Sequence, residues 1–318
     1  MLMPPLRIVF FGTAELALAS LSALINWPSG NIAAVVTQPD RPKGRRLHPA
    51  HSPVKNLATG QNLPVLQPER ARSSDFVQSL GELRPDLIIV VAYGQILPGR
   101  ILELPRFGCL NVHASLLPKY RGAAPIQWAI LNDERETGVT IMKIDEGLDT
   151  GDILSQETTA IGPDDNARTL HDRLAKTGAE LLMKTLPEYT AGRIPPRKQP
   201  AQGSSYARKI TRDDGRLDWT RPARDLWNCV RALIPWPGAH TCLPAEPGPQ
   251  LIKVWNAAIA DRSSSVPGEI LDVDGDGIVV ACGQNALRIL ELQREGGRRM
   301  SARQFIAGHP LRAGERLT

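Results

Sequence analysis

The run Asp86-Leu87-Ile88-Ile89-Val90-Val91-Ala92 decides the fold class of the first half of the chain. A short, unbroken run of β-branched and other apolar residues is typical of a strand that is buried on both faces of a parallel sheet. The run is far shorter than the roughly 20 apolar residues that a membrane-spanning helix requires. Further strands are predicted at residues 6–11, 32–37, 109–113 and 138–144.

Helical patterns fill the intervals between these strands, at residues 14–25, 54–59, 74–83 and 124–131, and a longer one covers 166–189. Ser52 followed by Pro53 marks a helix start, because the Ser hydroxyl can accept a free amide hydrogen and Pro fits the first turn. Strands that alternate with helices predict an α/β domain over residues 1–190, with a Rossmann-like, mostly parallel sheet.

A segment rich in Pro, Gly and polar residues follows at 191–206, and its composition predicts an extended linker. Beyond it, residues 207–318 contain one amphipathic helix at 223–233 and short strand patterns near 240–243, 251–257, 278–282 and 286–292. Short strands separated by turn signals predict a small C-terminal β-barrel that is OB-like, of the oligonucleotide-binding type.

The two halves of the chain differ in charge. Residues 1–191 carry 19 Lys and Arg against 20 Asp and Glu, whereas residues 192–318 carry 19 against 13, a net charge of +6. A basic half indicates a polyanionic partner, most commonly nucleic acid. A merely solvated basic surface is the alternative.

Several other classes of protein fit the sequence poorly. The four cysteines include no Cys-x-x-Cys pair, which argues against a structural zinc site or a disulfide framework. The N-terminus leads straight into a predicted strand and leaves no room for a secretion signal, so a cytoplasmic protein is expected. Gly12 follows the first strand without the other two glycines of a Gly-x-Gly-x-x-Gly turn, which disfavours NAD binding.

Two patterns match metal sites only in part. Asp272-Val273-Asp274-Gly275-Asp276-Gly277 begins like a calcium loop, but Gly283 stands where such a loop needs a bidentate Glu. A hairpin turn is the interpretation that this composition favours. His48 and His51 have no carboxylate or thiol beside them in the sequence, so a surface loop is predicted there and no metal is expected.

A basic loop follows the second predicted strand. Arg41, Lys43, Arg45 and Arg46 place four cations within six residues, where an α/β sheet has its binding crevice. Contact with phosphate groups is predicted for this loop, with an ordinary exposed loop as the alternative.

The most informative residues lie at the end of the predicted strand 109–113. Asn111 and His113 alternate there, so both side chains emerge on one face at the carboxyl end of the strand. A Gly-rich loop after the next strand carries Asp145, Asp149 and Asp152. These residues would supply one crevice with an amide donor, a titrating imidazole and a carboxylate.

These motifs resemble those of a known enzyme superfamily. Asn111-Val112-His113-Ala114-Ser115-Leu116-Leu117-Pro118 and Leu148-Asp149-Thr150-Gly151-Asp152 are similar to signatures of formyltransferases that use 10-formyltetrahydrofolate. Further segments resemble the methionyl-tRNA formyltransferase family in particular, namely residues 37–42, 52–55, 121–127, 136–142, 206–210, 218–219 and 235–238. The resemblance spans nearly the whole chain, although the linker and residues 244–250 are individual in sequence.

The resemblance implies transfer of the formyl group of 10-formyltetrahydrofolate to the amino group of methionyl initiator tRNA. It assigns catalysis to Asn111, His113 and Asp149. The Asn111 amide and a protonated His113 would donate hydrogen bonds to the formyl oxygen, while Asp149 orients the imidazolium. The folate site would be lined by Ser115, Leu116, Leu117, Pro118, Ala92, Tyr93, Leu97 and Asp145. The tRNA would be contacted by Arg41, Lys43, Arg45, Arg46 and Lys209, and a monomer is expected.

Three alternatives remain at this point. A formyltransferase of the same superfamily could act on an amino sugar nucleotide or on glycinamide ribonucleotide, although the basic loop and the second domain disfavour both acceptors. A hydrolase could release formate from the same folate with water as the acceptor. A non-catalytic RNA-binding protein could retain the scaffold, but Asn111, His113 and Asp149 are all present.

Overall fold

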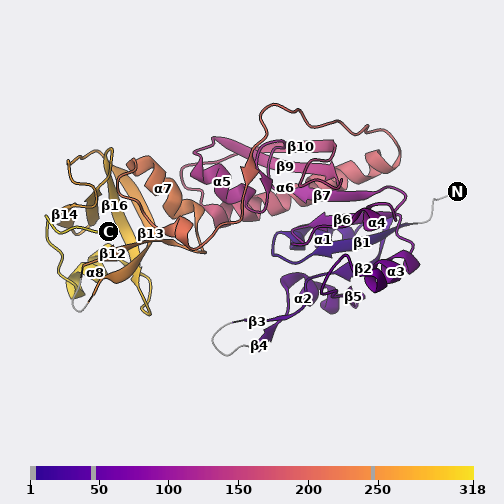
Figure 1. Ribbon diagram of the computed structural model, residues 1–318, viewed down its shortest axis with the longest axis horizontal. Coiled ribbons are helices and arrows are strands. Elements are labelled where there is room, and N and C mark those ends of the chain that lie inside the picture. The colour runs from indigo at the N-terminus through magenta and orange to yellow at the C-terminus, as the bar shows by residue number, and fades with distance from the viewer. Residues whose placement is uncertain (1–4, 44–47, 245–247) are drawn as a thin grey trace. The chain divides into compact units, whose positions relative to one another are not determined.

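The computed structural model describes residues 5–43, 48–244 and 248–318 (Figure 1). The chain forms two compact units. The first comprises residues 1–125, 136–160 and 171–208, and the second comprises 126–135, 161–170 and 209–318. The segment 191–206, predicted as a linker, is therefore grouped with the first unit. Two short stretches that precede it in sequence are grouped with the second.

A seven-stranded sheet forms the centre of the first unit, in the order β10-β9-β7-β6-β1-β2-β5. The strands are β1 (Leu6–Gly12), β2 (Gly30–Val36), β5 (Val65–Leu66), β6 (Leu87–Val91), β7 (Cys109–His113), β9 (Glu136–Lys143) and β10 (Ile153–Ala160). All neighbours from β5 to β7 are parallel, whereas β9 is antiparallel to both β7 and β10. The prediction of a mostly parallel sheet is confirmed, and β10 is an additional edge strand that the sequence patterns did not predict.

Helices cover both faces of this sheet. They are α1 (Ala17–Ile25), α2 (Pro53–Gly60), α3 (Ser74–Glu82), α4 (Gly99–Leu102) and α6 (Ala167–Thr190). The predicted helix start at Ser52 is confirmed, because its hydroxyl accepts a hydrogen bond from the Lys55 amide over 3.0 Å and Pro53 is the first helical residue.

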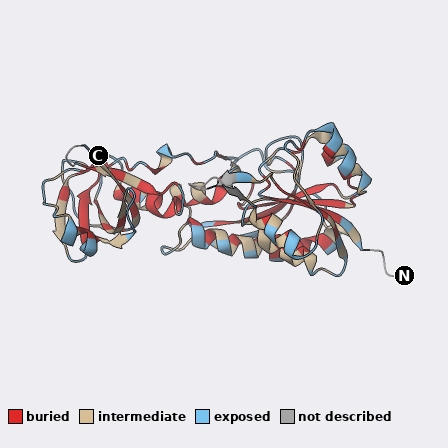
Figure 2. Ribbon diagram, turned by 90° about the horizontal axis from the view of Figure 1, so that it is seen from below, coloured by how far each residue is buried: buried red, intermediate tan, exposed pale blue. Residues whose placement is uncertain are grey.

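Alternation along each strand decides which side chains meet which helices. Val9 and Phe11 of β1 pack in one apolar cluster with Phe76 of α3 and Ile101 of α4. On the other face Gly178 of α6 lies so close to β7 that an added Cβ would stand 2.8 Å from a methyl group of Val112. Asn111 and His113 therefore face away from α6. Figure 2 shows the central strands as buried and the outer sides of the helices as partly exposed.

An antiparallel sheet dominates the second unit, in the order β12-β13-β16-β15-β14, with β17 paired to β16. These strands are β12 (Ala239–Leu243), β13 (Gln250–Ala260), β14 (Ile270–Asp274), β15 (Gly277–Ala281), β16 (Ala286–Arg294) and β17 (Met300–Ser301). The helical elements are α5 (Pro125–Leu131), of which residues 126–131 belong here, η1 (Asp213–Gly215), α7 (Ala223–Ala232) and α8 (Ala302–Gly308). The predicted small β domain is confirmed.

The last residues of the sequence join the two edges of this sheet. The backbones of Cys242 in β12 and Thr318 exchange hydrogen bonds of 2.7 and 3.0 Å. Just before Thr318, Leu317 donates to the Gly268 carbonyl and Glu315 accepts from the Ile270 amide, both over 2.8 Å. The segment 315–318 thus bridges β12 and the start of β14, which closes the sheet into a barrel.

An ion pair ties the earlier stretch 126–135 to α7 within the second unit, and hydrogen bonds tie the stretch 161–170 to it. Asp133 pairs with Arg224 over 2.8 Å. Arg231, which is buried, donates to the carbonyl oxygens of Gly162 and Asp165 over 3.1 Å each. Burial, followed by the neighbouring Arg224 charge, lowers the pKa of Arg231 from its usual value.

The Asp-rich segment 272–277 forms a hairpin between β14 and β15, as predicted. Asp274 pairs with Gly277 across the turn, and its carboxylate accepts hydrogen bonds from the Asp276 amide and from Arg288, both at 2.8 Å. The four cysteines are free thiols. Burial raises the pKa of Cys109, Cys229 and Cys282 to about 12 each, so these thiols stay protonated at neutral pH.

Candidate active site

Asn111 and His113 occupy the carboxyl end of β7 and meet the carboxylate of Asp149. Asn111 Nδ2 donates to Asp149 Oδ1 over 3.3 Å, and His113 Nδ1 lies 3.7 Å from Asp149 Oδ2. The side chain of His113 is 6% exposed and that of Asp149 is 16% exposed. Although Asp149 lies 38 positions beyond Asn111, the fold brings all three predicted catalytic residues into one partly sheltered cluster.

The loop between β9 and β10 presents Asp149 in a sterically demanding backbone conformation. Asp149 has a φ of 53°, in the left-handed region. At Gly151 an added Cβ would stand 1.8 Å from the Lys143 carbonyl oxygen, so the loop requires glycine there. The Gly122 amide donates to Asp149 Oδ2 over 2.8 Å. The carboxylate is therefore held by Asn111 on one oxygen and by a backbone amide on the other.

The hydrogen bonds of His113 define its protonation pattern. Its Nε2 lies 2.9 Å from the carbonyl oxygen of Tyr120. Because a carbonyl oxygen only accepts, Nε2 carries a proton and donates it to Tyr120. Nδ1 is then the ring nitrogen that faces the carboxylate, and a second proton there gives an imidazolium with Asp149 as its counter-ion.

The segment 115–118, predicted to line a folate site, is fixed largely by Thr140 of β9. The Thr140 hydroxyl donates to the Ser115 carbonyl over 2.7 Å and accepts from the Leu117 amide over 3.1 Å. Ser115 is fully buried and its hydroxyl donates to the Lys119 carbonyl, while Leu117 packs in a small core cluster. The side chains that remain partly exposed here are those of Leu116 and Pro118, which follows a cis peptide bond.

The predicted folate residues after β6 divide into core and surface. The ring of Tyr93 packs edge-on against Phe11 at 5.1 Å, and Leu97 is 5% exposed in the same core. Burial raises the pKa of Tyr93 to about 12. Ala92 is exposed, has a φ of 46° and accepts the Thr13 amide on its carbonyl. Of these three residues, only Ala92 is therefore exposed to a ligand.

The loop that carries Asp149 also approaches the segment after β6. Asp145 accepts hydrogen bonds from the Gly147 amide and from the Thr150 hydroxyl, at 3.1 and 2.8 Å, and so braces the loop internally. At Gly99, the first residue of α4, an added Cβ would stand 2.8 Å from Glu146 Oε1. The segment after β6, residues 92–99, is thus adjacent to the loop 145–151, which carries Asp149 of the cluster.

The predicted phosphate-binding loop forms a small hairpin of β3 (Arg41–Lys43) and β4 (His48–Ala50). Arg41 is exposed, whereas Arg45 and Arg46 lie outside the described residues. Lys209, predicted to contact tRNA, is exposed at the start of the last segment of the second unit. Lys43 is described only as the last residue of β3, without its side chain.

Asp40 anchors the base of this hairpin. Its carboxylate pairs with Lys55 of α2, accepts from Gln67 over 3.0 Å and pairs with His51 at 2.8 Å. These contacts, the hydrogen bond from Lys55 first, lower the pKa of Asp40 to about 2. His51 therefore has a carboxylate partner that lies eleven positions away and could not be read from adjacent sequence.

Two backbone groups in the cluster were not identified from the sequence. The Tyr120 carbonyl fixes the imidazole, and the Gly122 amide fixes the carboxylate. Gly122 lies in the motif 121–127, and Tyr120 directly precedes it. A sequence pattern identifies side chains, but it does not show which backbone groups point toward the catalytic cluster. The positive φ values of Tyr120 and Gly122, 60° and 111°, are the structural signature of that turn.

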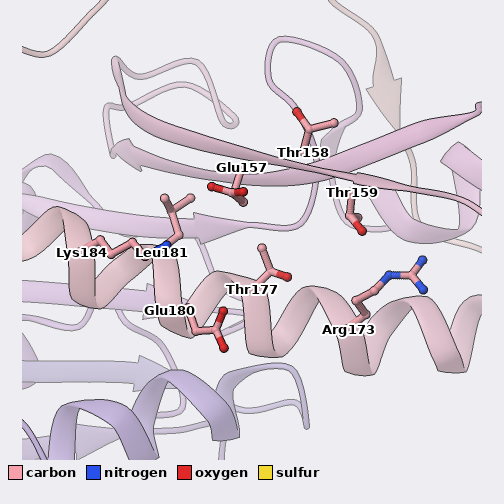
Figure 3. A pocket seen from close by; sticks show the side chains of 8 residues that line it. All are labelled: Glu157, Thr158, Thr159, Arg173, Thr177, Glu180, Leu181 and Lys184. Atoms are coloured by element: carbon pink, nitrogen blue, oxygen red, sulfur yellow. The ribbon is translucent and has the colours of Figure 1, made fainter.

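A separate hollow of about 160 Å³ lies between β10 and α6 (Figure 3). Glu157 and Glu180 line it together with Arg173 and Lys184, so acidic and basic groups balance. It lies on the α6 side of the sheet, away from Asn111 and His113. The balanced charges give this hollow no preference for an anion or a cation.

No group of three or more His, Cys, Asp or Glu in the described residues is placed to hold a metal ion. Likewise, across 5–43, 48–244 and 248–318, no helix is both long enough and apolar enough to cross a membrane.

Comparison with known proteins matches both units. Residues 6–186 match the formyl transferase family model, and residues 209–310 match the model of the formyl transferase C-terminal domain. The chain is 48% identical over 311 residues to the methionyl-tRNA formyltransferase of Caldanaerobacter subterraneus subsp. tengcongensis, covering 97% of this chain and 99% of the relative. It is 49% identical over 308 residues to the methionyl-tRNA formyltransferase of Myxococcus xanthus, covering 97% and 96%.

Solved structures share the fold at lower identity. An N-formyltransferase from Helicobacter canadensis, in complex with folinic acid and dTDP-3-aminofucose, gives a TM-score of 0.64 at 18% identity, covering 93% of this chain and 100% of the other. HypX from Aquifex aeolicus, in complex with tetrahydrofolic acid, gives a TM-score of 0.61 at 16% identity, covering 98% of this chain and 50% of the other. With full-length relatives at nearly half identity and both domain models matched, the chain belongs to the methionyl-tRNA formyltransferase family.

Proposed function

We propose that this chain transfers the formyl group of 10-formyltetrahydrofolate to the free amino group of methionine esterified to initiator tRNA. The product is N-formylmethionyl-tRNA, the substrate of translation initiation. The observation that carries the proposal is the meeting of Asn111, His113 and Asp149 at the carboxyl end of β7, in a chain of this family.

The residues around the cluster fit a flat folate. Two large apolar side chains on the segment 92–99 and the loop 145–151 are exposed, Ile96 by 77% and Leu148 by 46%. Exposed apolar side chains beside polar groups are typical of a ligand site, because the ligand covers them when it binds. Ala92 is exposed between these side chains and the strand end, so it would contact the face or edge of a bound heterocycle. The pterin is therefore assigned to the space between residues 92–97 and the loop that precedes Asp149.

The bound folate supplies a formyl carbon that the methionyl amine attacks, with N10 of the folate as the leaving group. Asn111 has two amide hydrogens, of which one is donated to Asp149, so the second is available to the formyl oxygen. A preorganised donor at the oxygen where negative charge develops is worth roughly 3 kcal/mol of barrier. Asn111 would thus donate one hydrogen bond to the Asp149 carboxylate and one to the formyl oxygen.

His113 supplies the second donor through Nδ1, because its Nε2 hydrogen is directed at the Tyr120 carbonyl. The 3.7 Å between Nδ1 and Asp149 is longer than a hydrogen bond, so a hydrogen on Nδ1 remains available to a formyl oxygen that lies in its direction. Asp149 stabilises the positive charge of the imidazolium. The attacking amine loses one proton and N10 gains one, and Asp149 can relay this proton through water.

The acceptor is a polyanion, and the basic residues agree with that chemistry. We assign phosphate contacts to Arg41 and Lys43 of β3, to Arg45 and Arg46 of the basic sequence that follows, and to Lys209 of the second unit. Such contacts position the substrate and make its binding weaken as salt rises.

The test is transfer of radiolabelled formyl from 10-formyltetrahydrofolate to methionyl initiator tRNA. Elongator methionyl-tRNA, free methionine and amino sugar nucleotides serve as alternative acceptors, and released formate is measured without any acceptor. Label on initiator tRNA alone is the expected result. Label on an amino sugar, or label released as formate, would be compatible with the catalytic role of the cluster but would overturn the assignment of tRNA as the acceptor.

A further inference from the structure

The segment 191–206 is bound to the loop that carries Asp149. The backbone of Arg197 exchanges two hydrogen bonds with Ile153, the first residue of β10, at 2.9 and 2.7 Å. Ile153 follows the loop of Asp149 by only a few residues. A stretch whose composition predicts a spacer therefore runs alongside the catalytic loop.

Gln199 makes four hydrogen bonds from this segment. Its Nε2 donates to the carbonyl oxygens of Asp149 and Gly151, both over 2.8 Å. Its Oε1 accepts from Nε and Nη2 of Arg121, over 3.1 and 2.7 Å. A carboxamide has two donor hydrogens and an acceptor oxygen with two lone pairs, so Gln199 is fully satisfied. Its orientation is fixed, because carbonyl oxygens only accept and a guanidinium only donates.

These contacts reach Asp149 from two directions. Gln199 holds the backbone of Asp149 directly. It also holds Arg121, the residue before Gly122, whose amide donates to the Asp149 carboxylate. Arg121 and Gly122 form the short strand β8, which pairs in parallel with β11 (Tyr206–Ala207), at the end of the same segment.

Asp149 needs such support in addition to the hydrogen bonds that Asp145 makes within the loop. The φ of 53° at Asp149 is disfavoured for a residue with a side chain. The preceding residues Gly147 and Leu148 are exposed and cannot restrain it by packing. Two hydrogen bonds from Gln199 fix the loop backbone where the carboxylate must face His113, and its other two hold Arg121.

We propose that Gln199 is a positioning residue for Asp149: it holds the backbone of the catalytic loop and, through Arg121, the amide that orients the carboxylate. This inference rests on the proposed formyl transfer, in which Asp149 stabilises the imidazolium of His113. Gln199 lies outside the motifs that suggested the catalytic residues, and it acts through Asp149 without touching the reacting atoms.

The full-length variants Gln199→Ala and Gln199→Glu test the proposal, with Gln202→Ala as the matched control. Gln202 belongs to the same segment, is exposed and makes no hydrogen bond to any described residue. Steady-state formyl transfer to methionyl initiator tRNA is measured for each variant. Gln199→Ala should lower kcat by about 10- to 100-fold, because a misplacement of roughly 1 Å in a catalytic group costs this much. KM for the tRNA should change by less than about threefold, since no tRNA contact is removed.

Gln199→Glu distinguishes two roles of Gln199: positioning the backbone of Asp149, and a purely structural contact with Arg121. The Glu side chain has the same shape and keeps an acceptor for Arg121, but its other oxygen faces the carbonyl oxygens of Asp149 and Gly151. It should therefore lose at least as much kcat as Gln199→Ala, while its thermal unfolding midpoint stays close to that of Gln202→Ala.

Two results would overturn the inference: a wild-type kcat in Gln199→Glu, or a loss in Gln199→Ala that lies in KM for the tRNA with kcat unchanged. Failure of the proposed function is seen separately, because the unmodified protein would then transfer no formyl group to methionyl-tRNA.

Discussion

Asp149→Asn is the substitution that tests the catalytic cluster most directly. Asn keeps the shape of the side chain but has one acceptor oxygen and two donor hydrogens in place of two acceptor oxygens. Asn111 Nδ2 and the Gly122 amide both donate to Asp149 in the structure. Whichever way the new amide turns, its NH₂ group faces one of these donors, and the counter-ion of His113 is lost.

The size of the effect follows from these contacts. Loss of a hydrogen bond to a charged acceptor costs about 1.5–3 kcal/mol. Removal of a unit charge 3.7 Å from His113 Nδ1 adds at most about 4.5 kcal/mol in a medium with an effective dielectric constant of about 20. Small movements of the neighbouring groups and entry of water reduce both of these energies, so we expect the transition state to lose about 3–5 kcal/mol of stabilisation. This corresponds to a kcat that is lower by about 10²- to 10⁴-fold.

The assay is single-turnover formyl transfer with the enzyme in excess over methionyl initiator tRNA. Filter binding at fixed salt measures tRNA affinity in parallel, which should stay within about twofold because Asp149 carries no phosphate contact. Asp152→Asn, in the same loop, is the control, since the Asp152 side chain makes no hydrogen bond to a described residue. An Asp149→Asn enzyme with a rate within about fivefold of wild type would refute the assigned role, because the loss would then be below that of one charged hydrogen bond.

Three further predictions follow from the site and its surroundings. His113→Ala should lower kcat by about 10²- to 10³-fold with tRNA affinity unchanged, and an equal loss of binding in a filter assay would contradict the role of donor. Arg45→Ala should weaken tRNA binding and reduce by about one the slope of log affinity against log salt; an unchanged slope would remove Arg45 from the tRNA site. Asp40 has a pKa lowered to about 2, so its ionisation stabilises the folded state above the usual carboxyl pKa, and this contribution is lost as pH falls from about 4 toward 2. The gap in unfolding midpoint between wild type and Asp40→Asn should therefore close over that range, and a constant gap would show that the contacts with Lys55 and His51 do not depend on the charge.

The sequence predicted the parallel part of the first sheet and the residues of the cluster for related reasons. Buried strands such as β6 are continuous apolar runs, and residues such as Asn111 and His113 stand at strand ends, where a parallel sheet gathers its functional groups. The residues of a strand do not indicate whether the strand runs parallel or antiparallel to its neighbours. β9 has an apolar pattern but runs antiparallel to β7, because the pairing is decided by the connection to its neighbours.

The parts of the site that escaped prediction are of two kinds. The Tyr120 carbonyl and the Gly122 amide are backbone groups, which every residue has, so no residue type marks them. Gln199 was hidden by the composition of its surroundings: Pro, Gly and polar residues do predict a segment without helix or strand, but they do not tell whether that segment is free or packed. β10 was missed because Ile153–Ala160 is half exposed and polar, as an edge strand often is.

The closure of the barrel by residues 315–318 sets the order in which the second unit can form during synthesis. Cys242 in β12 leaves the ribosome 76 residues before its partner Thr318. Until then the edge of β12 and the start of β14 lack the backbone donors and acceptors that residues 315–318 supply in the folded structure. Exposed edges of this kind pair readily with other chains. The second unit is therefore an open sheet until residues 315–318 have been synthesised, and we expect it to be most prone to aggregation in that interval.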